Sequence, residues 1–201
     1  GLGGARRTRA AVWLRRARYA APRAQLFRVL ALVNPSSEDA RRSGALLAWC
    51  ELRLGRPAAA KARADDVLAA SPADPYGRLV RGVLRANAGD FAGALADLEV
   101  AEVHAETAPH ARLRLAAVLV AEGRLHAAGP RVRALLRRRA GEPAVRLVAG
   151  WYALGTGDAA GAGAHAAAAL RQAPELPAAR DLAARAGAAT EARSALLELD
   201  P

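Results

Sequence analysis

Few residues of this 201-residue chain could carry out chemistry, and they are far apart in the sequence. Histidines can serve as acid–base catalysts or metal ligands, and the chain has four of them: His104, His110, His126 and His165. None stands in an HExxH pattern or next to a cysteine at the spacing of a metal site. His104 and His110 could bind a metal together with Glu102 and Glu106, but these residues fall at a helix end and in a linker, which favours a solvated surface.

The other two candidates for chemistry are a single cysteine and a glycine cluster. Cys50 has no histidine near it in the sequence that could activate it, so we interpret it as a buried core residue. The stretch GTGDAAGAG at residues 155–163 lacks both the dinucleotide-binding spacing and the GK[ST] ending of a phosphate loop, which favours turns. We therefore expect no enzyme activity, no metal, no cofactor and no small-molecule substrate.

The elements that carry these residues follow a repeat. One glycine recurs every 34 residues, always between two apolar runs with helical spacing, at Gly55, Gly89, Gly123 and Gly157. This period predicts four units of two helices each, at residues 41–74, 75–108, 109–142 and 143–176.

Turn and cap residues stand where such helix pairs require them. Glycine suits the left-handed backbone that follows a helix end, because it has no Cβ to clash there. Asp90 and Asp158 follow two of these glycines and suit the N-cap of the next helix. Pro72 and Pro174 occupy the same place in two units and are expected to end the second helix.

Small residues recur at two further places of the repeat. The eighth place holds Ala48, Gly82, Ala116 and Gly150, and the twentieth holds Ala60, Ala94, Ala128 and Ala162. Small side chains at both places let the paired helices approach closely. With this pattern, residues 41–176 resemble tetratricopeptide repeats, although the aromatic residue usual at the fourth place is replaced by Gly44, Arg78, Arg112 and Arg146. The resemblance implies an all-α fold, an α-solenoid of antiparallel helix pairs.

The two ends of the chain match the repeat poorly, as terminal units of a repeat array often do. Residues 1–40 are expected to form a basic helical hairpin or degenerate repeat around Pro22. Residues 177–201 are expected to cap the array with two short helices.

The resemblance also implies a concave groove, lined by the second, fifth, ninth and twelfth places of each first helix. The large apolar occupants of these places are Trp49, Leu52, Tyr76, Leu79, Val83, Leu113, Val120, Leu147, Trp151 and Leu154. Exposed apolar surface that contains Trp and Tyr is typical of partner sites, so we expect these residues to anchor an amphipathic helix or an extended apolar segment. The alternative is that they pack between neighbouring first helices or lie under the N-terminal hairpin. A chaperone-tail clamp of Lys and Asn is not expected, because Lys61 and Asn87 stand alone.

The net charge of +11 is concentrated in two segments. Residues 6–28 hold eight arginines and no acid, and residues 131–139 read RVRALLRRR. Candidate anion-binding residues are Arg15, Arg16, Arg18, Arg131, Arg133, Arg137, Arg138 and Arg139. Such segments can bind nucleic-acid phosphates or an anionic membrane surface, but a solvated face or contact with an acidic partner subunit is the favoured interpretation. A further series at 34-residue spacing, Arg78, Arg112, Arg146 and Arg180, is either a stripe for an acidic ligand or a set of surface residues whose stems cover apolar surface.

The sequence thus predicts a non-enzymatic scaffold or adaptor that binds a partner protein in its groove as a subunit of a larger complex. A basic module for nucleic acid or membrane surfaces is the alternative, as is a docking part of a longer protein. Because the chain begins at Gly1 and contains no Met, we expect a processed product or a piece of a longer chain. No run of about 18 uncharged apolar residues occurs, so we expect a soluble protein, in the cytoplasm rather than the periplasm.

Overall fold

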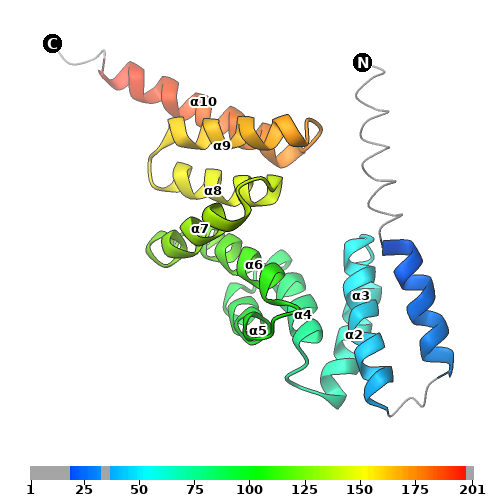
Figure 1. Ribbon diagram of the computed structural model, residues 1–201. Helices are drawn as coiled ribbons and strands as arrows, with labels where there is room; N and C mark the ends of the chain where they lie inside the picture. The colour runs from blue at the N-terminus through cyan, green and yellow to red at the C-terminus, as the bar shows by residue number, and fades with distance from the viewer. Residues whose placement is uncertain (1–18, 33–36, 198–201) are drawn as a thin grey trace. The chain divides into compact units, whose positions relative to one another are not determined.

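The computed structural model describes residues 19–32 and 37–197, and side chains as far as residue 190 (Figure 1). Every regular element in this part of the chain is a helix, which confirms the all-α fold. Residues 19–32 form what we call the N-terminal helix. The helices that follow are α2 (Glu38–Arg53), α3 (Pro57–Ala70), α4 (Pro75–Asn87), α5 (Phe91–Val103), α6 (Ala108–Ala121), α7 (Leu125–Arg139), α8 (Pro143–Gly155), α9 (Ala159–Gln172) and α10 (Pro177–Leu197).

Helices α2 to α9 fall two by two near the predicted repeats. The first and second helices of a unit pack on each other in the pairs α2 with α3, α4 with α5, and α8 with α9. Helix α3 also contacts α4, and α2 contacts α4, so one pair packs on the next. Consecutive helix pairs of this kind are the arrangement expected of an α-solenoid.

The recurring glycines adopt the backbone for which glycine is needed. The φ angles are 75° at Gly55, 82° at Gly89, 75° at Gly123 and 84° at Gly157, and no other residue of the described chain has a positive φ. The predicted caps are present as well. Asp90 accepts a hydrogen bond from the Gly93 amide at 2.9 Å, and Asp158 accepts one from the Gly161 amide at 2.8 Å. The helices α3 and α9 end at Ala70 and Gln172, before the two prolines.

Small residues at the eighth place bring the paired helices together, as the sequence predicts. A Cβ on Gly82 would lie 3.3 Å from the Ala94 carbonyl oxygen and 2.9 Å from a Leu98 carbon. A Cβ on Gly150 would lie 3.5 Å from the Ala162 carbonyl oxygen and 2.4 Å from a Leu182 carbon. At Gly82 a larger side chain would thus press on the paired helix α5, whereas at Gly150 it would press on Leu182 of α10 and make an ordinary contact with the Ala162 carbonyl oxygen of the paired helix α9.

The arginine series at 34-residue spacing holds the turns between units. Three of its members donate a hydrogen bond to the carbonyl oxygen six residues earlier, in the turn that precedes their helix: Arg78 to Pro72, Arg146 to Ala140 at 2.7 Å, and Arg180 to Pro174 at 2.8 Å. Arg112 instead lies 3.4 Å from a carboxylate oxygen of Glu102. The four guanidinium groups thus have partners within the protein, although the side chains of Arg112 and Arg180 stay 48% and 56% exposed.

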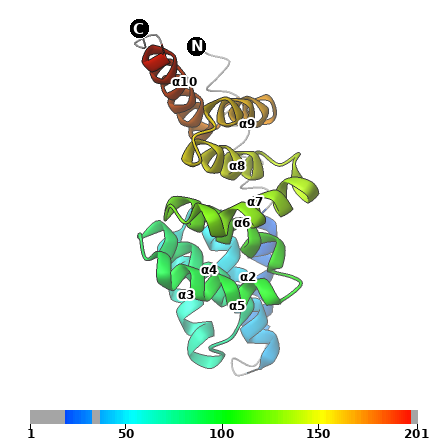
Figure 2. The ribbon, with the colours of Figure 1, turned by 90° about the vertical axis from the view of Figure 1, so that its left-hand side faces the viewer.

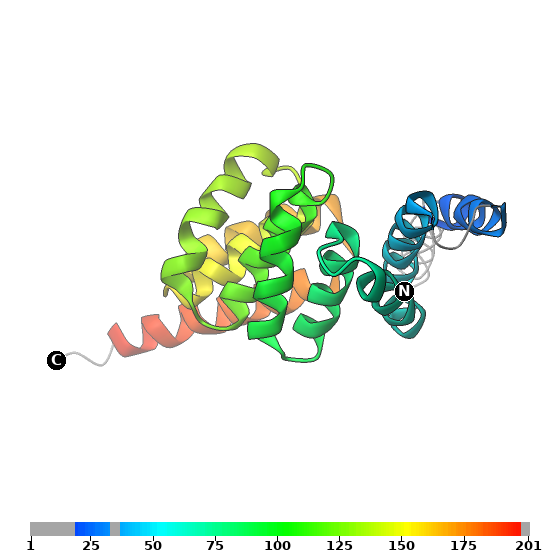
Figure 3. The ribbon, with the colours of Figure 1, turned by 90° about the horizontal axis from the view of Figure 1, so that it is seen from below.

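The chain divides into two compact units, Gly1–Arg114 and Leu115–Pro201, which we call unit 1 and unit 2 and describe separately. In unit 1 the N-terminal helix lies beside the α2–α3 pair (Figures 1 and 3). Its Arg23 bonds to Glu51 of α2 at 2.7 Å, and the guanidinium of Arg63 on α3 lies 5.5 Å from the Phe27 ring. In unit 2, α8, α9 and α10 pack against one another (Figure 2).

Both ends differ from the expectation. No turn occurs at Pro22, because residues 19–32 are one helix whose half-buried side chains lie on a single face that packs on α2 and α3; the preceding arm of the expected hairpin lies outside the described residues. The predicted pair of short C-terminal helices is one helix, α10. The Ala-rich sequence from Pro177 onward contains no internal proline, and Gly187 is accommodated within the helix.

Candidate binding surface

The ten predicted groove residues do not form an exposed apolar surface. In unit 1, Trp49, Leu79 and Val83 are buried, and Leu52, Tyr76 and Leu113 are half-buried. In unit 2, Val120, Leu147, Trp151 and Leu154 are all half-buried.

Trp49 is covered by residues of its own unit. Its side chain is 7% exposed. The His110 ring lies 4.9 Å away between centroids, and the Arg53 guanidinium lies 5.6 Å from the indole. The expectation that Trp49 anchors a partner is therefore wrong. The same expectation is wrong for Leu79, which is 0% exposed, and for the buried Val83. These three residues hold unit 1 together.

Trp151 takes part in packing within unit 2. It lies with Leu147 and Leu154 against a buried cluster that includes Leu182 and Ala186 of α10. The guanidinium of Arg185, also on α10, lies 5.4 Å from the indole ring. These half-buried residues of α8 are thus partly covered by the C-terminal helix α10, a cover that the sequence analysis did not name.

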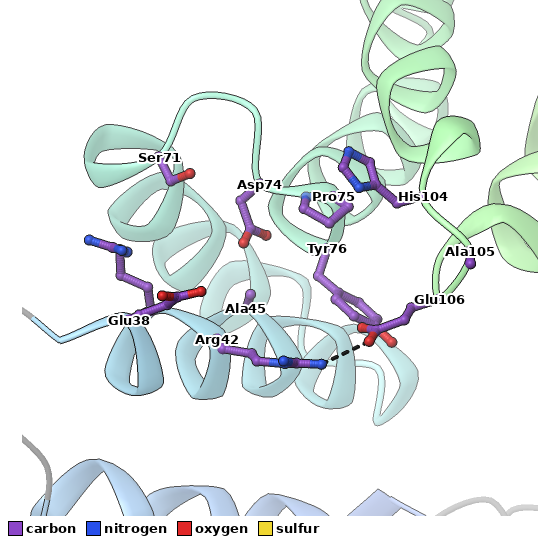
Figure 4. A pocket seen from close by; sticks show the side chains of 11 residues that line it. Glu38, Arg42, Ala45, Ser71, Asp74, Pro75, Tyr76, His104, Ala105 and Glu106 are labelled. Atoms are coloured by element: carbon purple, nitrogen blue, oxygen red, sulfur yellow. Dashed lines mark hydrogen bonds and ion pairs between the residues drawn. The ribbon is translucent and has the colours of Figure 1, made fainter.

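A pocket of about 440 Å³ opens on unit 1 where three parts of the chain meet (Figure 4). It lies among α2, the α3–α4 turn with the start of α4, and the α5–α6 connection. Its lining residues are Glu38, Arg41, Arg42, Ala45, Ser71, Asp74, Pro75, Tyr76, His104, Ala105 and Glu106. Unlike the expected groove, this pocket is lined mostly by polar or charged residues, and it carries both signs of charge.

Local structure fixes the positions of the pocket residues. Ser37 caps α2 through the Ala40 amide at 3.1 Å, and Asp74 caps α4 through the Gly77 amide at 2.7 Å. Arg42 donates a hydrogen bond to Glu106 at 2.8 Å, which joins α2 to the α5–α6 connection beside the Tyr76 ring (Figure 4). Burial, and then the Glu106 carboxylate, raise the pKa of Tyr76 above its usual value, so the phenol stays protonated and able to donate.

Sequence reasoning named Tyr76 of these residues as a groove residue, and His104 and Glu106 only as possible metal ligands. It held a groove signal for two more. Arg42 stands at the second place of its 34-residue repeat, which is the place that Tyr76 holds in the next repeat. Ala45 stands at the fifth place of the same repeat as Arg42. Restricting the groove to large apolar side chains left out both the charged Arg42 and the small Ala45. Glu38, His104 and Glu106 lie outside those places and give no such signal.

The predicted anion-binding segments are only partly described. Arg133, Arg137 and Arg138 are exposed on α7, whereas Arg131 and Arg139 are half-buried and Arg139 pairs with Glu142 at 2.6 Å. The remaining three candidates, Arg15, Arg16 and Arg18, lie outside the described residues.

In the described part of the chain, the other residues considered for chemistry, Cys50 and the glycine cluster, have structural roles. Cys50 is buried, and burial followed by the charge of Glu51 raises the pKa of its thiol. The glycine cluster forms the α8–α9 turn and the start of α9, with Gly157 at positive φ and Asp158 as the cap. Within the described ranges, no three His, Cys, Asp or Glu side chains are grouped so that they could hold a metal ion. Nor does that part of the chain contain a helix that combines the length and apolar character needed to cross a membrane.

Comparison with known proteins yields no relative, since no protein family and no curated protein matches this chain. The resemblance to tetratricopeptide repeats therefore stays a prediction.

Proposed function

We propose that this protein is a non-catalytic helical-repeat scaffold that binds a charged segment of a partner polypeptide in the pocket of unit 1. The observation that carries the proposal is the pocket itself, which is lined by matching places of two successive first helices, Arg42 and Tyr76. Helices hold these side chains in place before the partner arrives, which lowers the ordering cost of binding.

The charges of the pocket indicate the character of the partner segment. Glu38 and Arg41 form no ion pair with any described residue, and Arg42 and Glu106 pair only with each other, at more than half exposure each. An exposed pair of this kind contributes little to stability, so both groups can exchange partners at small cost. A segment with both acidic and basic side chains would complement this pocket better than the apolar helix that the sequence favoured.

The test compares charge reversal inside and outside the pocket. Three chains are used to capture proteins from nuclease-treated lysate of the source cells: the native chain, the pocket variant Arg42→Glu and the control Arg138→Glu. Arg138 is an exposed residue of α7, outside the pocket. The proposal expects one discrete protein to be retained by the native chain and by Arg138→Glu and lost with Arg42→Glu. Equal retention by all three chains would remove the pocket from the function.

A second candidate rests on α7, whose exposed Arg133, Arg137 and Arg138 pair with no carboxylate of the described chain. Such a face could bind nucleic acid or an anionic membrane through release of counterions. This candidate predicts that binding falls steeply with added salt and is lost with Arg138→Glu, while Arg42→Glu leaves it unchanged.

A further inference from the structure

Two arginines of unit 1 lie together in an unusual environment. Trp49 and Arg53 are one turn apart on α2, and His110 and Arg114 are one turn apart on α6. Since the Trp49 and His110 rings are in contact at 4.9 Å, the next turn of each helix places Arg53 and Arg114 near each other. The positive charge of Arg53 is felt at Arg114, where burial and then that charge lower the pKa of the guanidinium.

Neither arginine has a counter-ion in the described chain. Both are half-buried, and the Nε of Arg53 is fully buried without a hydrogen-bond partner. The Arg53 guanidinium lies 5.4 Å from the Tyr19 ring and 5.6 Å from the Trp49 ring, so aromatic faces hold it in place. Other partly buried arginines of unit 1 differ, since Arg23 and Arg81 each bond to a buried carboxylate.

A pair of like charges without a counter-ion costs stability, and a buried donor without a partner adds to that cost. An oxyanion would remove both costs at once. The planar guanidinium fork matches the oxygens of a carboxylate or a phosphate, and two forks side by side could bind one such group from two directions.

We propose that Arg53 and Arg114 form a binding site for an oxyanion carried by a partner polypeptide, either a carboxylate or a phosphorylated side chain. The inference rests on the proposed function. Arg42, Trp49 and Arg53 follow one another at intervals that keep them on one face of α2, so the site lies along the helix from the pocket. From Arg42 to Arg53 the helix rises about 16 Å, a span that about five residues of an extended chain would cover.

The experiment follows the side-chain Nε–Hε NMR signals of the arginines in the full chain at constant ionic strength. The probes are hexaglutamate, hexaglutamine, inorganic phosphate and acetate. Arg53→Gln and Arg114→Gln assign the two signals and test the site, and Arg171→Gln is the control with the same change of charge on an exposed surface of α9.

Hexaglutamate is expected to shift both signals to saturation, with affinity lowered at least about tenfold by Arg114→Gln and unchanged by Arg171→Gln. Hexaglutamine is expected to leave both signals unmoved. Of the two small anions, the one that shifts them at lower concentration identifies the source of the oxyanion. The unfolding temperature of Arg114→Gln separates a structural role from a binding role. If Arg114 stabilises the fold, the variant unfolds at a lower temperature. If Arg114 is an uncompensated charge of a binding site, the variant unfolds at the same or a higher temperature.

Absence of a saturable shift with every anion would overturn the inference, as would equal weakening by Arg171→Gln. Retention of the partner by the Arg53→Gln and Arg114→Gln chains, combined with its loss in Arg42→Glu, would overturn this inference and leave the proposed function standing. If anions bind saturably but Arg42→Glu loses no partner, the proposed function fails and the oxyanion site stands.

Discussion

The rings of Trp49 and His110 pack with their centroids 4.9 Å apart and their planes inclined by 47°. This contact joins α2 to the start of α6 within unit 1. It covers the indole that the sequence made the leading partner anchor.

The first prediction concerns this contact. Trp49→Ala should lower the free energy of unfolding by about 3 kcal/mol, because it removes a buried aromatic side chain and leaves a cavity. Leu32→Ala is the control, since Leu32 is 87% exposed, and it should change little. Urea unfolding measures both. A Trp49→Ala chain of native stability that had lost its partner would restore Trp49 as an anchor.

The second prediction concerns the turn glycines. Gly89→Ala should destabilise the protein by about 1 kcal/mol, because alanine is strained at a φ of 82° although nothing lies within 4 Å of the added Cβ. Gly141→Ala is the matched control, because its Cβ would also meet nothing and its φ is not positive. Equal unfolding midpoints for the two variants would show that the backbone conformation is not what selects glycine at Gly89.

The third prediction concerns a buried carboxylate, Asp97, which accepts hydrogen bonds from Arg78, Arg81 and Arg85 at 2.7 to 2.8 Å. Burial alone would raise the pKa of Asp97, but the hydrogen bonds of Arg81 and Arg78 and the charges of Arg81 and Arg85 outweigh it and lower the pKa. Asp97→Asn should cost about 3 kcal/mol at neutral pH, because it leaves these cations without their partner.

The pH dependence of that difference follows from the sign of the shift. The native state favours the ionised form of Asp97, so its contribution is complete above the pKa of an unfolded aspartate, about 3.9, and is lost as the pH falls through the lower native value. Unfolding curves of the native chain and Asp97→Asn should therefore converge in acid. A difference that stayed constant down to low pH would exclude ionisation as its source.

The fourth prediction concerns His165, whose Nδ1 lies 3.3 Å from Nη1 of Arg146. Burial, and then the charge of Arg146, lower the pKa of His165. The native state thus favours neutral histidine, and stability should fall as the pH drops below about 6.5, the usual value of an unfolded histidine. His165→Gln should remove this part of the pH dependence between pH 7 and 5. An unchanged slope in the variant would assign the effect to other groups.

The repeat, its turns and its close helix contacts could be predicted from the sequence because they depend on residues near one another. Gly89 and Asp90 form a turn and a cap with their immediate neighbours, and Gly82 meets the next helix of its own pair. The burial of Trp49 could not be predicted in the same way. Its burial depends on His110, which belongs to a later repeat, and no local pattern specifies that contact.

The polar pocket was missed for a different reason. Arg42 and Ala45 stand at places of the repeat that the sequence analysis considered, and both line the pocket, but only large apolar side chains were accepted as candidates. The sequence did not indicate a site at Arg53 and Arg114 either. Whether an arginine has a counter-ion depends on contacts between distant residues, which the local sequence does not specify.

The measurement that tests the central claim most directly is photo-crosslinking from inside the pocket. A photoreactive phenylalanine is placed at Tyr76, which lines the pocket, and separately at Ala96, which is exposed on α5 and does not line it. The account predicts that one discrete polypeptide of the source cells crosslinks from Tyr76 and not from Ala96, and that Arg42→Glu abolishes the product. The same products from both positions, or nucleic acid alone, would contradict it.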